Sequence, residues 1–118
     1  MGDLSRNFSR LEFDCPCCGK FLPCPALING LQAIRDLVGP IHVNSGTRCA
    51  AHNRAVGGSS TSEHLLGHAA DIWAYAATWQ QLAALAETIP EFRDGGIGRY
   101  PKKKFVHVDI GKKRRWIL

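Results

Sequence analysis

Long apolar runs are missing from this sequence, and no stretch approaches the about 18 residues that a membrane-spanning helix requires. The opening residues, MGDLSRNFSRLEF, also lack the apolar core of a secretory signal peptide. We therefore expect a chain without a membrane span that is cytoplasmic when it is made. Internal repeats and low-complexity linkers are absent too. A length of 118 residues without such breaks predicts a single domain over residues 1–118.

Cysteine, in contrast, is frequent: the chain has five, and an odd count argues against a complete disulfide framework. Four of them lie in a Cys- and Pro-rich loop at 14–25, DCPCCGKFLPCP, where Pro and Gly break any regular element. Thiolates favour zinc, so a second, structural zinc is one interpretation of this loop, with the ligands Cys15, Cys17, Cys18 and Cys24. The spacing is not that of paired Cys-x-x-Cys motifs, and adjacent cysteines rarely bind one ion together. We therefore favour packed or free thiols, with Cys49 packed beside the loop.

The charge of +5 is unevenly distributed, because eight of the fifteen Lys and Arg residues fall between Arg99 and Arg115. Such a stretch could bind nucleic acid, an anionic membrane or another anionic polymer such as a cell wall. The alternative is a basic edge that is simply exposed to solvent. Only three aromatic residues interleave it, which is a weak pattern for base stacking. We expect no nucleic-acid partner.

Apolar spacing predicts three helices and five strands. The helices are expected at 25–39, 49–58 and 78–89, the last with a Thr-x-x-Gln capping box. The strands are expected at 40–46, 68–75, 95–100, 105–111 and 115–118. Because helices and strands do not alternate strictly, we predict an α+β fold with an antiparallel sheet flanked by helices.

The segment FVHVDI places Val106, Val108 and Ile110 on one face of a strand, and His107 and Asp109 on the other. The segment SEHLLGHAAD, residues 62–71, supplies further candidates for a metal site. Two imidazoles and one carboxylate with a fourth position left open are typical of a catalytic zinc. Spacing alone leaves both His64 and His68 open as the partner of Asp71.

These segments resemble the zinc D-alanyl-D-alanine carboxypeptidase family of peptidoglycan peptidases. The family pattern Ser-x-His-x-x-Gly-x-Ala-x-Asp is met by Ser62, His64, Gly67, Ala69 and Asp71. An upstream Ser-Gly-x-Arg is met by Ser45, Gly46 and Arg48, and a downstream His-x-Asp by His107 and Asp109. The resemblance implies one zinc bound by His64, Asp71 and His107, with His68 outside the ligand set. It also implies the hedgehog/DD-peptidase-like fold.

Catalytic roles follow from the same resemblance. Arg48 is expected to bind the carboxylate or the carbonyl oxygen of the substrate, which suits a guanidinium. Ser62 either bonds near the site or caps the turn. Relatives carry an acidic residue three positions before the last zinc histidine, where this chain has Lys104. We take Asp109 as the general base; the alternative is that Asp109 orients His107, and Glu63 is a weaker candidate.

The resulting hypothesis is a monomeric zinc metallopeptidase that cuts peptidoglycan stem peptides, at D-Ala-D-Ala or L-Ala-D-Glu. A phage or prophage lysis enzyme, acting on the cell wall after release, fits the absence of a signal peptide. The basic stretch would then contact the anionic wall. Two other hypotheses are a non-catalytic zinc-containing module that binds the cell wall and, less in keeping with the aromatic pattern, a nucleic-acid binder.

Overall fold

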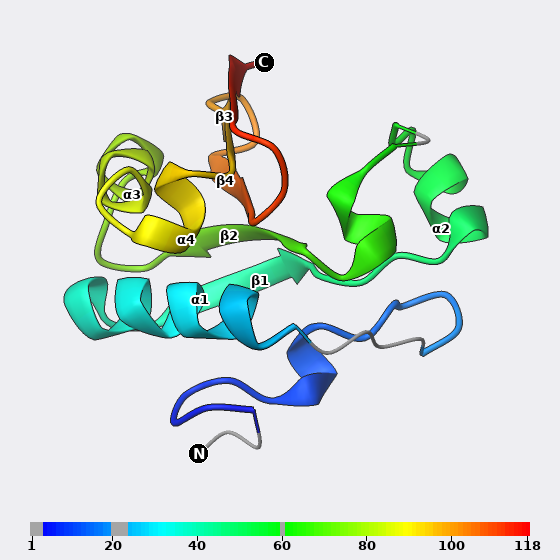
Figure 1. Ribbon diagram of the computed structural model, residues 1–118, viewed down its shortest axis with the longest axis horizontal. Coiled ribbons are helices and arrows are strands. Elements are labelled where there is room, and N and C mark those ends of the chain that lie inside the picture. The colour runs from blue at the N-terminus through cyan, green and yellow to red at the C-terminus, as the bar shows by residue number, and fades with distance from the viewer. Residues whose placement is uncertain (1–3, 20–23, 60) are drawn as a thin grey trace.

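The structure, a computed structural model, describes residues 4–19, 24–59 and 61–118, which form an α+β fold (Figure 1). The helices are η1 (Arg10–Glu12), α1 (Pro25–Val38), α2 (Ala50–Ala55), η2 (Glu63–Leu66), α3 (Trp79–Ala86) and α4 (Pro90–Arg93), where η marks a 3-10 helix. The strands are β1 (Ile41–Ser45), β2 (Ala69–Ala74), β3 (Gly96–Tyr100), β4 (Phe105–Asp109) and β5 (Arg114–Ile117). Each helix and strand expected from the sequence is present, with ends shifted by a few residues. Among the helices of the described residues, none has the length and apolar character needed to cross a bilayer.

The five strands form one sheet in the order β1-β2-β4-β3-β5. Neighbouring strands are antiparallel except β3 and β5, which are parallel. The prediction of an antiparallel sheet is therefore wrong at this edge, and the sheet is mixed. The reason is topological. Both edges of β4 are already paired, so β5 reverses direction after β4 and pairs beyond β3, with which it then runs parallel.

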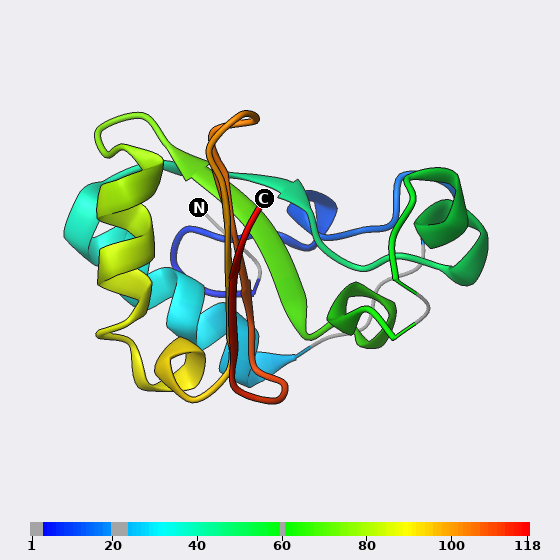
Figure 2. The same ribbon diagram turned by 90° about the horizontal axis from the view of Figure 1, so that it is seen from above.

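One face of the sheet carries the hydrophobic core. Side chains alternate between faces, so the apolar residues of β2 and β4 point together towards the helices. The core includes Leu31, Ile34, Ile72, Phe92, Val106 and Val108. Helices α3 and α4 lie to one side of strands β3 and β4, whereas α2 lies to the other side (Figures 1 and 2). The Thr-x-x-Gln capping box of α3 is present as predicted, because Thr78 Oγ1 accepts the N–H of Gln81 at 3.2 Å.

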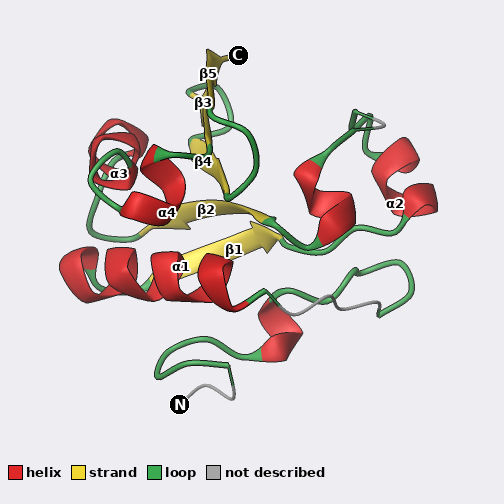
Figure 3. Cartoon of the chain, viewed as in Figure 1, coloured by secondary structure: helices red, strands yellow, loops and turns green. Residues whose placement is uncertain are grey.

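The opposite face of β2, β3 and β4 is polar at its centre. Asp71 of β2 pairs in register with His107 of β4, and Gly96 and Gly98 of β3 lie opposite Asp109 and His107. Two glycines are needed here for space. A Cβ atom on Gly96 would lie 2.3 Å from the Asp109 carboxylate, and one on Gly98 would lie 2.3 Å from the Trp116 indole. His64 of η2 contacts Asp71 on this face. Figure 3 shows α2 on the far side of strands β3 and β4 from α3 and α4.

Candidate metal centre

Three side chains from distant parts of the chain converge on one point. The ligand atoms of His64, Asp71 and His107 all lie within 4.8 Å of one another. Asp71 Oδ1 is 3.2 Å from His64 Nε2 and 3.0 Å from His107 Nδ1. All three residues are buried. The structure therefore brings together the three residues that the sequence predicted as ligands.

The outer hydrogen bonds of the two imidazoles assign their protons. His64 Nδ1 lies 2.7 Å from the carbonyl oxygen of Gly46, which can only accept, so Nδ1 carries the proton. His107 Nε2 lies 2.7 Å from Asp109 Oδ2, a carboxylate that also accepts. When both rings are neutral, the remaining nitrogens each point a lone pair at Asp71 Oδ1. Two lone pairs facing a carboxylate favour a cation between them, and an N,N,O donor set suits zinc.

Local turn chemistry holds His64 in place. Ser62 caps η2, since its Oγ accepts the backbone N–H of His64 at 3.2 Å. Gly67 closes the same turn in the left-handed region at φ 72°. Ser62 also lines the cleft beside the metal centre, so its predicted contact with substrate stays a prediction.

Asp109 is completely buried, and both of its carboxylate oxygens have donors. Oδ1 accepts the backbone N–H groups of Gly96 and Gly111, each at 2.9 Å. Oδ2 accepts from His107, and Arg114 Nη2 lies 3.6 Å away. Burial alone would raise the pKa of Asp109, but these hydrogen bonds, led by that of His107, lower it below the ordinary value. This geometry favours the alternative in which Asp109 orients His107 over a role as general base.

The pKa values of Asp71 and His107 are shifted in opposite directions. Burial alone would raise the pKa of Asp71, yet the hydrogen bonds from His107 and His64 hold it well below its usual range. Burial alone would lower the pKa of His107, yet its bonds to Asp109 and Asp71 raise it above the ordinary value. In the metal-free protein the centre is thus an ionised carboxylate that favours a proton on the neighbouring imidazole.

Arg48 lies against the metal centre. Its Nη2 is 3.3 Å from Asp71 Oδ2, its Nε donates to Ser45 Oγ at 3.2 Å, and its Nη1 donates to Asn53 Oδ1 at 3.1 Å. Asn53 is buried in α2, and its own Nδ2 donates to the carbonyl of Ser59 at 2.7 Å. Asn53 is not among the residues that the sequence predicted, although it is a polar residue within the segment that carries the motif. These contacts fix the guanidinium plane and engage three of its five N–H groups.

A cleft of about 770 Å³ opens beside the metal centre, lined by residues that include Arg48, Ser62, Glu63, His64, Asp71 and His107. Trp116 forms part of its wall, with its ring 5.0 Å from that of His107. Trp116 Nε1 donates to the hydroxyl of Tyr100 at 2.9 Å, and the Arg114 guanidinium lies 5.0 Å over the indole. The sequence did not predict this wall, because the aromatic residues of the basic stretch indicate no more than a weak pattern for base stacking.

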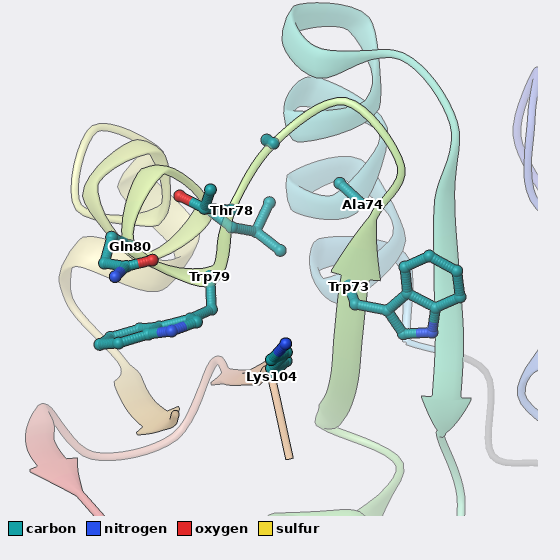
Figure 4. Close-up of a pocket in the computed structure, with 8 residues that line it drawn as sticks. Trp73, Ala74, Thr78, Trp79, Gln80 and Lys104 are labelled. Atoms are coloured by element: carbon teal, nitrogen blue, oxygen red, sulfur yellow. The ribbon is translucent and has the colours of Figure 1, made fainter. Parts of the chain in front are cut away.

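Lys104, at the position where the family resemblance led us to expect an acidic residue, lines a different pocket. That pocket, of about 350 Å³, is also lined by Trp73 and Trp79 (Figure 4). Lys104 has φ 59°, the one positive φ of a non-glycine residue in the described part of the chain. The cleft carries two carboxylates from described residues, Asp71 and Glu63. Glu63 Oε1 lies 3.3 Å from Nδ1 of His68, which accords with His68 lying outside the ligand set.

Curated proteins of two kinds, a carboxypeptidase and L,D-endopeptidases, are similar in sequence to this chain. The chain is 39% identical over 88 residues to a zinc D-Ala-D-Ala carboxypeptidase of Streptomyces albus G, covering 73% of this chain and 34% of that protein. It is 31% identical over 100 residues to the peptidoglycan L,D-endopeptidase MepK of Escherichia coli K12, covering 78% of this chain and 53% of that protein. A probable MepK of Haemophilus influenzae is 33% identical over 81 residues, covering 64% of this chain and 42% of that protein.

The chain thus spans about a third to a half of the length of these curated relatives. The profile of the family described as peptidase M15 matches residues 7–109, which include the three converging side chains and Arg48. The chain belongs to the peptidase M15 family.

Proposed function

We propose that this chain is a zinc-dependent peptidase that hydrolyses a peptide bond in peptidoglycan stem peptides. The observation that carries the proposal is the convergence of His64, Asp71 and His107, with one ring nitrogen of each histidine directed at the same carboxylate oxygen. A zinc ion bound there would polarise a carbonyl group and make water nucleophilic near neutral pH. The names of the relatives, a carboxypeptidase and L,D-endopeptidases, support this substrate class.

The chain's own residues would position the substrate. The cleft beside the metal centre admits a peptide, and Arg48 lines it with a guanidinium plane that Ser45 and Asn53 hold in place. A fixed guanidinium suits a substrate carboxylate or the developing negative charge on a carbonyl oxygen. Ser62, at the entrance of η2, lines the same wall.

Proton transfer needs a carboxylate oxygen that other donors do not already occupy. Among the described residues, the contact of Glu63 with His68 uses Oε1 and leaves Oε2 for this role. Asp109 was our predicted base, but its contacts with His107, Gly96 and Gly111 support an orienting role. Glu63 is the cleft-lining carboxylate of the described residues that lies outside the ligand set. We therefore assign proton transfer to Glu63 and the orientation of His107 to Asp109. Turnover by Glu63→Gln at the wild-type rate would remove this assignment.

Two further parts of the proposal concern the peptide bond that is cut and the biological setting. Both D-Ala-D-Ala and L-Ala-D-Glu are compatible with a cleft that has an anchored guanidinium. Arg48 would bind a substrate with a free terminal carboxylate most strongly. We propose a monomer with the hedgehog/DD-peptidase-like fold that acts as a phage or prophage lysis enzyme after release to the wall. The basic residues of β5 and its flanks supply an electrostatic contact with an anionic wall.

The decisive experiment measures zinc content and turnover on purified peptidoglycan, with mass spectrometry of the released fragments. His64→Ala should lose both the catalytic zinc and fragment release. His42→Ala, an exposed histidine on β1 away from the cleft, is the matched control and should keep both. Release of D-alanine alone would indicate a carboxypeptidase, and release of cut stems would indicate an endopeptidase. Bound zinc at this centre with no fragment from any wall would indicate the non-catalytic wall-binding module instead.

A further inference from the structure

Four sulfur atoms gather outside the metal centre, and we call Cys15, Cys17, Cys18 and Cys49 the cysteine cluster. The Sγ atoms of Cys15, Cys18 and Cys49 all lie within 4.8 Å of one another. Cys17 Sγ lies 3.8 Å from Cys49 Sγ. The loop that follows η1 runs beneath α2, which brings residues about thirty positions apart together (Figure 1). Cys24 instead packs against the hydrophobic core at the start of α1.

The local turn explains how neighbouring cysteines reach one point. The backbone N–H of Gly19 donates to the carbonyl of Cys15 at 2.7 Å, and Gly19 adopts φ 75°. The chain therefore reverses over residues 15–19, so that Cys15 and Cys18 face the same side. These two residues form a Cys-x-x-Cys pair that the Cys17-Cys18 doublet hides in the sequence. Paired thiolates at this spacing are a common half of a structural zinc site.

The sulfur spacing fits a metal better than a disulfide. Zinc with tetrahedral Zn–S bonds of about 2.3 Å holds its sulfurs about 3.8 Å apart. The distance of 3.8 Å between Cys17 and Cys49 agrees with that value. A disulfide would require about 2.05 Å between the sulfurs, and it would leave the other two thiols of the cluster without a role.

Backbone donors already orient two of the sulfurs. The N–H of Cys49 donates to Cys15 Sγ at 3.4 Å, and the N–H of His52 donates to Cys49 Sγ at 3.4 Å. Such bonds to sulfur hold ligands in the geometry that a metal needs. Cys15 is buried, whereas Cys17 and Cys18 are exposed, so an ion can enter from solvent.

We propose that the cysteine cluster is a second, structural zinc site, with Cys15, Cys18 and Cys49 as ligands and Cys17 beside Cys49 at the rim of the site. The site joins the loop at residues 13–19 to the segment that leads into α2. The same two segments also meet through the N–H of Thr47, which donates to the carbonyl of Phe13 at 2.8 Å. Arg48 immediately precedes Cys49, so this zinc also anchors the backbone that positions the guanidinium beside Asp71.

The test is the zinc stoichiometry of the protein purified under reducing conditions, measured by plasma mass spectrometry and thiol titration. We expect two zinc ions per wild-type chain. His64→Ala should keep one, and Cys49→Ser should also keep one. Cys24→Ser is the matched control, because it removes a thiol outside the cluster, and it should keep two.

Cobalt substitution identifies the type of ligand in the wild-type protein itself. Wild-type protein and His64→Ala, loaded with Co²⁺, should both show the intense near-ultraviolet charge-transfer band of thiolate-bound cobalt. A single zinc in wild type that disappears in His64→Ala, with no thiolate band, would overturn the proposal. So would a mass two hydrogens lower than calculated under mild purification, because a Cys17–Cys49 disulfide would then occupy the cluster.

Discussion

The Nε2 atom of His107 lies 2.7 Å from Oδ2 of Asp109, and this contact is shielded from solvent because Asp109 has no exposed surface. The contact fixes which nitrogen of His107 carries the proton. It thereby decides whether Nδ1 offers a lone pair towards Asp71 or not. The same relationship makes Asp109 a positioning residue whose effect is exerted on metal affinity.

Asp109→Asn should therefore weaken zinc binding at the metal centre by about 10- to 100-fold. The amide oxygen can still accept the N–H groups of Gly96 and Gly111, so the fold survives. The amide nitrogen then donates to His107 Nε2, which moves the imidazole proton to Nδ1 and removes the lone pair that faces Asp71. Competition with a chromogenic chelator gives the affinity.

The matched control for this change is Asp94→Asn, because Asp94 is an exposed aspartate outside the cleft. It should leave zinc affinity unchanged. If Asp109→Asn kept zinc at full affinity but lost turnover, Asp109 would again be the candidate general base.

Arg48→Lys should lower kcat/KM for peptidoglycan fragments by about 10- to 100-fold, the equivalent of one charged hydrogen bond of about 1.5–3 kcal/mol. A lysine keeps the charge but cannot contact Ser45, Asn53 and Asp71 in one plane. Zinc content should stay at the wild-type level, since Arg48 is not a ligand. Steady-state kinetics with metal analysis measures both. Arg54→Lys, on the exposed side of α2, is the control, and an equal loss there would contradict a specific role for Arg48.

Lys104→Gly should stabilise the protein by about 1 kcal/mol, because φ 59° is strained for a residue with a Cβ atom. Activity should remain unchanged, since Lys104 lines the pocket with Trp73 and Trp79 and not the cleft. Urea denaturation measures the free energy of unfolding of both proteins. Lys102→Gly, in the same turn without a positive φ, should be neutral or destabilising. A lower stability of Lys104→Gly would refute the strain argument.

The metal-free protein should lose stability as the pH rises through neutrality. The folded-state pKa of His107 lies above its unfolded value of about 6.5, so its contribution is complete below that pH and is lost as the pH passes the folded pKa. Zinc requires the unprotonated imidazole, so the stabilisation by zinc should grow over the same range. Thermal unfolding from about pH 6 to about pH 8.5, with zinc or with a chelator, measures both trends. A pH-independent difference between the two samples would contradict the shifted pKa of His107.

Local patterns were sufficient for most of the secondary structure. The 3.6-residue spacing of α1, the capping box of α3 and the alternation in FVHVDI each predict an element that is present. The parallel pairing of β5 with β3 was not predictable in this way. It depends on which strand edges remain open after β2, β3 and β4 have paired, which is a property of the whole sheet.

The metal centre was predictable as a set of residues, because the motif resembles a known family. The role of Asp109 was not, since the alternation of a strand shows its face but does not reveal that Gly96 and Gly111 donate to its carboxylate. The partnership of Cys49 with the loop at 14–25 was equally hidden. It arises from the packing of two segments that are far apart in sequence.

The two imidazoles of the metal centre are held by partners of different kinds, and this makes them unequally vulnerable to mutation. His107 depends on the side chain of Asp109, so a single codon change can redirect its proton. His64 depends on the carbonyl of residue 46, which every amino acid supplies. A substitution at position 46 acts through the size of the new side chain, because a Cβ on Gly46 would lie 2.7 Å from the backbone of Phe13. A descendant that lost catalysis but kept the fold would therefore be expected to lose Asp109 before it lost the contact between His64 and the carbonyl of residue 46.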